Sequence, residues 1–315
     1  MKHNIKVTLI LLAMFMITQL IGIYVVNYYS PVKIIDGQVT KVSAPGIPYG
    51  MQPPEIKEPT EYFQMMVSIF VAFAIAIALI FFLMKFGVEF ILKLWFFVVI
   101  VIALGIAFNS FIPQFKFASA IVSLIALPLA YIKIYKPNFY VHNLTELVIY
   151  PGIAAVFVPL LNIWTIIALL FVISIYDMWA VWHSGIMQKM AKYQINKLNI
   201  FSGFFVPYIG KRIRPKLKKL SKAKLKKAKI KVNVAILGGG DVIFPIIAAG
   251  VMLKTIGYIS VGSIILPIAS FFIILGAGLG LGYLFFAAEK KKFYPAMPFI
   301  TAGILLGMLV YWLVF

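Results

Sequence analysis

Two aspartates lie well inside apolar stretches of the sequence, Asp177 within residues 163–188 and Asp241 within residues 232–253. An ionised carboxylate at membrane depth is costly unless another group pairs with it, hydrates it or uses it. The two isolated carboxylates are therefore the first candidates for chemistry. By sequence, the other seven acids fall in connections or at the ends of apolar stretches: Asp36, Glu55, Glu58, Glu61, Glu89, Glu146 and Glu289.

The depths of the two aspartates allow them to meet. At about 1.5 Å of rise per residue, Asp241 lies roughly 14 Å from a helix start near Val232, and Asp177 lies roughly 17 Å from a helix end near Gln188. Two carboxylates a few Å apart do not readily hold two charges, so they share a proton and titrate as a unit. Such a pair can deprotonate a water for attack on a peptide carbonyl and protonate the carbonyl oxygen, as in aspartic proteases.

The neighbours of each aspartate fit this use. Gly238 and Gly240 have no side chain, so another backbone can approach Asp241 closely, at a cost of about 1 kcal/mol each in helix propensity. Pro245 removes the N–H that the Asp241 carbonyl would bond in a helix, so we expect the helix to be loosened there. Tyr176 precedes the other aspartate and points roughly 100° away from it, which gives it a secondary role.

The composition identifies a membrane protein. Hydrophobic residues make up 63% of the 315 residues, charged residues 12%, and the mean hydropathy is +1.01. A soluble domain is nearer half hydrophobic. No alternating strand pattern is evident, and backbone groups in lipid need internal partners, so we predict an all-α, polytopic membrane protein in the cell membrane.

Nine apolar stretches are about long enough to be membrane-spanning helices. An odd number places the two termini on opposite sides. The predicted spans are Val7–Tyr28, Gln64–Met84, Leu94–Ile112, Phe117–Tyr135, Leu147–Leu161, Ile163–Gln188, Val232–Leu253, Tyr258–Ala288 and Tyr294–Phe315.

Lys and Arg residues set the predicted orientation. Of the 29, 24 fall on the side that carries the N-terminus, and 15 of these lie in residues 189–231. The positive-inside rule then places the N-terminus in the cytosol and the C-terminus outside. We expect an N-terminal membrane half over residues 1–188, a basic cytosolic connection over 189–231 and a C-terminal membrane half over 232–315.

The net charge of +20 favours anionic lipid over nucleic acid, because the basic residues border apolar spans. Within the basic connection, Leu217, Leu220 and Leu225 share one face of a helix, which suits binding to lipid headgroups; a mobile, solvated charge run is the alternative. The sequence has no Cys and three scattered His residues, so we expect neither a metal nor a cofactor.

A third element, Pro295-Ala296-Met297-Pro298, opens the last span. Prolines are well placed at a helix start, where the N–H groups are unpaired. Alternatively, two prolines three residues apart keep this segment extended, which requires a protein or water-lined environment at membrane depth.

Together these motifs resemble the presenilin and signal peptide peptidase family of intramembrane aspartyl proteases. Tyr176-Asp177, Gly238-Gly239-Gly240-Asp241 and Pro295-Ala296-Met297 match its YD, GxGD and PAL motifs in order and in span, and the similarity covers the whole chain. The resemblance implies Asp177 and Asp241 as the catalytic pair and residues 295–297 as support for the active site and substrate. Met297 departs from the usual Leu. The cytosolic basic connection resembles presenilins; signal peptide peptidases place it outside.

The sequence therefore predicts an intramembrane endopeptidase acting on transmembrane peptides, membrane proteins or signal peptides. Its substrate must unwind, and we hypothesise that it pairs as a strand with residues 295–297 or with the loosened start of the seventh span. One alternative is a proton- or cation-coupled transporter that uses the two aspartates. Another is a prepilin or preflagellin peptidase, which also uses GxGD but has fewer spans and lacks the third motif.

Overall fold

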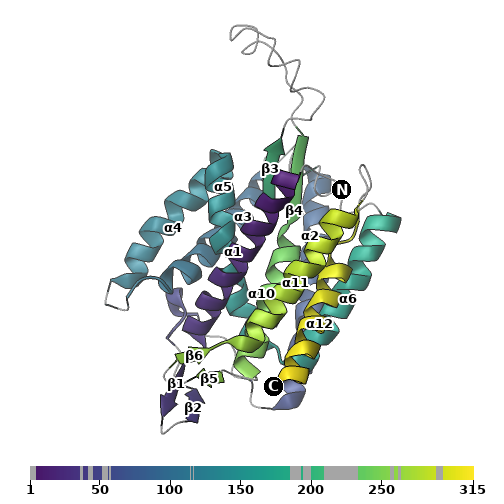
Figure 1. Cartoon of the computed structure of the whole chain (residues 1–315). Helices are drawn as coiled ribbons and strands as arrows, with labels where there is room; N and C mark the ends of the chain where they lie inside the picture. The colour runs from purple at the N-terminus through teal and green to yellow at the C-terminus, as the bar shows by residue number, and fades with distance from the viewer. Residues whose placement is uncertain are drawn as a thin grey trace.

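The computed structural model is a bundle of long helices with three small β-hairpins at its two ends (Figure 1). Each hairpin is a separate two-stranded antiparallel sheet. The structure describes residues 5–35, 38–41, 45–51, 56, 58–113, 115, 117–184, 193, 200–208, 233–255, 259–261, 264–288 and 294–315.

The described residues contain nine α-helices of 17 to 28 residues, one at each predicted span. The prediction of an all-α membrane protein is confirmed at the level of fold class. Eight segments are long and apolar enough to cross a membrane by the criteria of length and hydropathy; the 17-residue α10 is not among them, so nine spans stays a prediction. The helices are α1 (Ile5–Tyr29), α2 (Pro59–Phe86), α3 (Glu89–Asn109), α4 (Ala118–Tyr135), α5 (Phe139–Phe157), α6 (Ile163–Trp179), α10 (Gly239–Thr255), α11 (Ile268–Ala287) and α12 (Met297–Val314).

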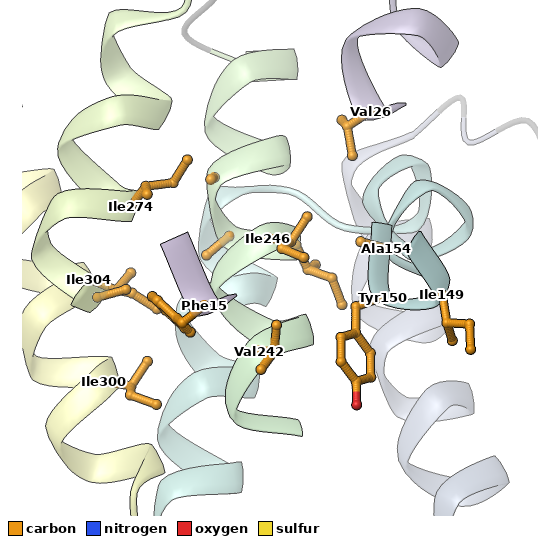
Figure 2. Packing of buried hydrophobic residues seen from close by; sticks show 14 of the residues in the cluster. Phe15, Val26, Ile149, Tyr150, Ala154, Val242, Ile246, Ile274, Ile300 and Ile304 are labelled. Atoms are coloured by element: carbon orange, nitrogen blue, oxygen red, sulfur yellow. The ribbon is translucent and has the colours of Figure 1, made fainter. Parts of the chain in front are cut away.

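The core of the bundle lies around α10, which packs against α1, α5, α6, α11 and α12. Figure 2 shows side chains of α1, α5, α11 and α12 around α10, with Tyr150 of α5 beside Val242 of α10, and Phe15 of α1 near Ile300 and Ile304 of α12. All five are nearly inaccessible to solvent. Because the lipid is as apolar as these side chains, close packing rather than burial from water holds such helices together.

Glycines bring α11 and α12 into backbone contact. A Cβ on Gly276 would collide with the carbonyl of Gly303, and a Cβ on Gly280 would collide with that of Phe299. These two glycines belong to the run Gly276, Gly278, Gly280 and Gly282, whose small-xxx-small spacing allows close helix contact. In contrast, Gly282 faces open space. The remaining glycine of the run, Gly278, faces Met16 of α1, so the run packs against two helices.

The hairpins are features that the sequence analysis missed. Their strands are β1 (Val32–Ile35) with β2 (Gln38–Lys41), β3 (Gly203–Tyr208) with β4 (Asn233–Gly238), and β5 (Ile259–Val261) with β6 (Ile264–Leu266). Two predicted helix starts are consequently wrong. The span predicted from Val232 is a strand until Gly238, and the span predicted from Tyr258 becomes helical only at Ile268. Short apolar runs rich in β-branched residues do not distinguish strand from helix by periodicity.

The fifth helix also begins earlier than predicted, at Phe139 rather than Leu147, with the Asn138 side chain accepting a hydrogen bond from the Tyr140 N–H as its N-cap. Glu146 is therefore an interior residue of α5, and it is buried. The assignment of this acid to a span end was wrong.

The start of α1 lies at the same end of the bundle as β3 and β4, whereas the end of α12 lies near the other two hairpins (Figure 1). Most of the predicted basic connection, including its Leu217, Leu220 and Leu225 face, lies outside the described residues. Its lipid binding and the predicted division into two membrane halves stay predictions.

Candidate active site

The fold brings the two predicted aspartates together. Asp177 lies near the end of α6 and is buried, with 7% of its surface exposed, and Asp241 is half-buried in the first turn of α10. The two helices are in contact, and the carboxylates are close enough for their charges to interact. The predicted depth of Asp241 within its helix was wrong, because the residues before Gly239 form β4.

Residues 295–297 lie against Asp177. Its Oδ2 accepts a hydrogen bond of 3.0 Å from the backbone N–H of Met297, the first residue of α12. N–H groups at a helix start lack helical partners and favour a carboxylate. Tyr294 and Pro295 are not helical, and Met297 is buried. The predicted third element, residues 295–297, therefore lies beside Asp177.

A second contact ties α12 to α6. Ser174 Oγ and Thr301 Oγ1, both buried, are 2.8 Å apart and hydrogen-bonded. Ser174 is about one turn from Asp177, and Thr301 is about one turn from Met297. The two helices are therefore fixed side by side at the level of the carboxylate.

Of the three glycines before Asp241, the middle one is the most tightly packed. A Cβ on Gly239 would lie 3.0 Å from Ser202 Oγ and 3.0 Å from the Tyr150 hydroxyl oxygen. Gly240 is exposed, as the expectation of an accessible backbone requires. A Cβ on Gly238 would lie 3.2 Å from Asp241 Oδ2.

Two other sequence expectations concern Pro245 and Tyr176. The backbone is extended in β4 before Asp241, and α10 is helical from Gly239 through Pro245 to Thr255. Because Pro245 has no N–H, the loosening of the helix at Asp241 stays a prediction. The buried Gln19 of α1 donates its side-chain N–H to the Val242 carbonyl at 3.0 Å, which adds a partner for the backbone in this turn. Tyr176 is 44% exposed on the outer face of α6 and packs near Trp179, away from the carboxylates.

The hairpin that leads into Asp241 is bonded to α5. Asn143 donates its side-chain N–H to the Phe205 carbonyl and accepts from the Phe205 N–H, both at 3.1 Å. His142 Nε2 is 2.8 Å from the Gly203 carbonyl oxygen. These side chains occupy the edge of β3 that faces away from β4.

His142, Asn143, Glu146 and Tyr150 were not among the predicted site residues. A signal was available: residues 142, 146 and 150 recur at four-residue spacing, which places them on one face of a helix. Their significance depends on the hairpin, which the sequence analysis did not predict. Among the described residues, no group of three or more His, Asp or Glu side chains is arranged to hold a metal ion.

Comparison with known proteins is consistent with this arrangement. Two solved structures, both of a presenilin family intramembrane aspartate protease, share the fold. In the C222 space group the TM-score is 0.59 at 17% identity, covering 98% of this chain and 99% of that one; in the P2 space group it is 0.57 at 16% identity, covering 98% of each. Comparison with curated protein sequences gives no match.

The family comparison extends over most of the sequence. A model of the family described as signal-peptide peptidase, presenilin aspartyl protease matches residues 41–315. This match, together with the candidate spans, identifies a multi-pass membrane protein and gives no support to a transporter. The chain belongs to the signal-peptide peptidase and presenilin family of intramembrane aspartyl proteases.

Proposed function

We propose that Asp177 and Asp241 form a catalytic dyad that hydrolyses peptide bonds within transmembrane segments of membrane proteins or signal peptides. The observation that carries this proposal is the juxtaposition of the two carboxylates, one near the end of α6 and the other at the start of α10. Asp177 has a fixed orientation because Met297 donates its N–H to it. Asp241 lies beside the exposed Gly240, where a substrate backbone can approach.

The reaction requires one proton on the pair. The ionised carboxylate takes a proton from a water molecule as the water oxygen bonds to the peptide carbon, and the protonated carboxyl gives its proton to the carbonyl oxygen. In the second step the carbon–nitrogen bond breaks and the amine leaves with a proton returned from the dyad. No other reactant is needed.

The substrate must present its carbonyl, which a helix conceals in a hydrogen bond. The outer edge of β4 can hold an unwound segment. Phe205 pairs with Ile236, but the Phe205 N–H and C=O are bonded to Asn143. The pair is therefore a non-hydrogen-bonded pair of the ladder, and the N–H and C=O of Ile236 point away from β3.

This geometry favours β4 over residues 295–297 as the strand partner. The Met297 N–H is already donated to Asp177, whereas the outer edge of β4 runs directly toward Asp241. We infer that an extended substrate adds to β4 and places its carbonyl at the dyad.

Cleavage of a transmembrane peptide by the purified protein in liposomes tests the proposal. Asp177→Asn and Asp241→Asn preserve side-chain size but cannot exchange the protons, so we expect each to abolish cleavage. Glu61→Gln, which changes an acid near the start of α2, serves as the control and should cleave as the unmodified protein does. Full proteolysis by either aspartate variant would refute the dyad, and proton flux without proteolysis would favour transport.

A further inference from the structure

A buried polar cluster joins α4 and α5 and includes neither Asp177 nor Asp241. Lys133 Nζ is 2.7 Å from Glu146 Oε1 and 3.2 Å from His142 Nδ1, and all three residues are at most 6% exposed. Removing such charges from water is expensive, and an ion pair of this kind adds little net stability. Its position beside the hairpin suggests a role other than stability.

The ammonium group of Lys133 determines which ring nitrogen of His142 carries the proton. A lysine ammonium has three donors and no acceptor, so Nδ1 of His142 must accept its hydrogen bond. The ring proton of the neutral imidazole is then on Nε2, which donates to the Gly203 carbonyl at 2.8 Å. Glu146 Oε1, in turn, lies 3.5 Å from the Gly203 N–H as its acceptor. The cluster therefore meets both backbone groups of Gly203.

Asn143 does the same for Phe205, two residues along the strand. Residues 203 and 205 direct their backbone groups to the same edge of β3, so α5 completes that edge with side chains in place of a neighbouring strand. A buried backbone group without a hydrogen-bond partner is strongly unfavourable. These bonds consequently hold the strand in one position against α5.

The position of β3 determines that of Asp241, because β3 pairs with β4 and β4 leads into Asp241. Gly203 pairs with Gly238, the last residue of β4, and Phe205 pairs with Ile236. Gly203 has a φ of 147°, and a Cβ there would collide with the Leu237 carbonyl, so the two strands meet closely at this point. Asp241 follows Gly238 by less than one helical turn.

Tyr150 adds a contact at the same junction. Its ring meets Phe204 of β3 edge to face, with centroids 5.6 Å apart, and its hydroxyl lies against Gly239. Thus α5 contacts both the strand that aligns β4 and the first residue of α10 (Figure 2 shows Tyr150 reaching toward α10).

We propose that Asn143, with His142 beside it, is a positioning residue for the dyad: it clamps β3 to α5, and the clamped hairpin fixes Asp241 opposite Asp177. The proposal rests on the proposed function for its effect on catalysis. The clamp itself is a structural property and is measurable without activity.

The kinetic test uses Asn143→Leu, which has a similar volume but neither hydrogen bond. Misplacing a catalytic group by about 1 Å can cost on the order of 100-fold. We expect kcat to fall about 10- to 100-fold while KM changes less than about 3-fold and the unfolding midpoint moves little. Asn143→Gln, which keeps the amide, should recover part of kcat. Leu144→Ala changes the exposed neighbour on the same helix and should match the unmodified enzyme.

A second measurement follows the hairpin directly. Because the chain has no cysteine, a single nitroxide label can be placed through Val234→Cys on β4, and a control label through Leu279→Cys on the exposed face of α11. We expect Asn143→Leu to increase the mobility of the label at 234 and to leave the label at 279 unchanged.

The outcomes separate the two proposals. An unchanged label at 234 in Asn143→Leu overturns the clamp, and a mobile label with undiminished kcat overturns its positioning role. If the unmodified protein does not cleave while the label at 234 still responds, the clamp is supported and the proposed function fails.

Discussion

The carboxylate of Asp177 is oriented by backbone groups at the start of α12, among them the N–H of Met297. Because every residue except proline has this N–H, the hydrogen bond does not depend on the side chain at position 297. The Met297 side chain is buried, so its volume has a separate packing role. The departure from Leu at this position therefore leaves the contact with Asp177 intact.

Replacing Met297 separates these two roles. Met297→Leu conserves volume and N–H, so we expect activity within a few-fold of the unmodified enzyme. Met297→Ala loses packing alone, whereas Met297→Pro loses the same packing and the N–H as well. A hydrogen bond to a charged group contributes about 1.5 to 3 kcal/mol, so kcat of the Pro variant should be about 10- to 100-fold below that of the Ala variant.

The comparison is made on folded protein, with the helical signal and the unfolding midpoint of each variant measured in parallel. Position 297 is the first residue of α12, where proline is best tolerated in a helix. Equal kcat values for the Pro and Ala variants would show that the bond to Asp177 does not contribute to the reaction.

The residues that could carry out chemistry were predicted better from the sequence than the residues that support them. Asp177 and Asp241 stood out because a charge in an apolar stretch requires an explanation. Glu146 did not, since its partner Lys133 is on another helix and the start of α5 was placed too late. Asn143 gave no signal because its function is to satisfy the backbone of a strand that was not predicted.

Among the elements, helices were predicted well and hairpins poorly. Apolar runs of about twenty residues indicate helices in lipid, whatever their detailed pattern. The run Val234-Ala235-Ile236-Leu237 is continuous in apolar character with α10, so it was assigned to the same helix. Only pairing with β3, across residues 209–232, makes it a strand, and pairing over such a distance is not visible in a local pattern.

The outward N–H of Ile236 makes substrate pairing testable. Proline at this position removes an N–H that the β3–β4 ladder does not use, as Pro207 already does on β3. We expect Ile236→Pro to keep the hairpin and to lower kcat/KM about 3- to 10-fold or more, because the substrate loses a hydrogen bond. The assay is cleavage of a transmembrane peptide over a range of concentrations.

Two variants serve as controls for this change. Ile236→Val retains the N–H and should remain close to the unmodified enzyme. Ala235→Pro removes an N–H that faces β3, and it should disturb the hairpin itself, with a larger loss of kcat. If Ile236→Pro cleaves as well as Ile236→Val, the substrate does not use this N–H.

For the whole molecule, the connections between helices lie at one or the other end of the bundle. The start of α1 lies at the end of the bundle with β3, which is part of the basic connection, and β4, which follows it; the end of α12 lies at the opposite end (Figure 1). The active site is nearer the first end, since Asp177 is close to the end of α6 and Asp241 to the start of α10. If the basic connection is cytosolic, substrates are cut toward the cytosolic side of the membrane.

Cysteine labelling in intact cells tests this orientation, because the chain has no native cysteine. Tyr140 near the start of α5 and Phe315 after α12 are both exposed and belong to opposite predicted sides. The excess of Lys and Arg predicts that a membrane-impermeant maleimide labels Phe315→Cys at once and Tyr140→Cys only after permeabilisation. The reverse pattern would invert the molecule and place the carboxylate pair toward the outer surface. Labelling of both before permeabilisation would contradict the odd number of spans, five, predicted between these two positions.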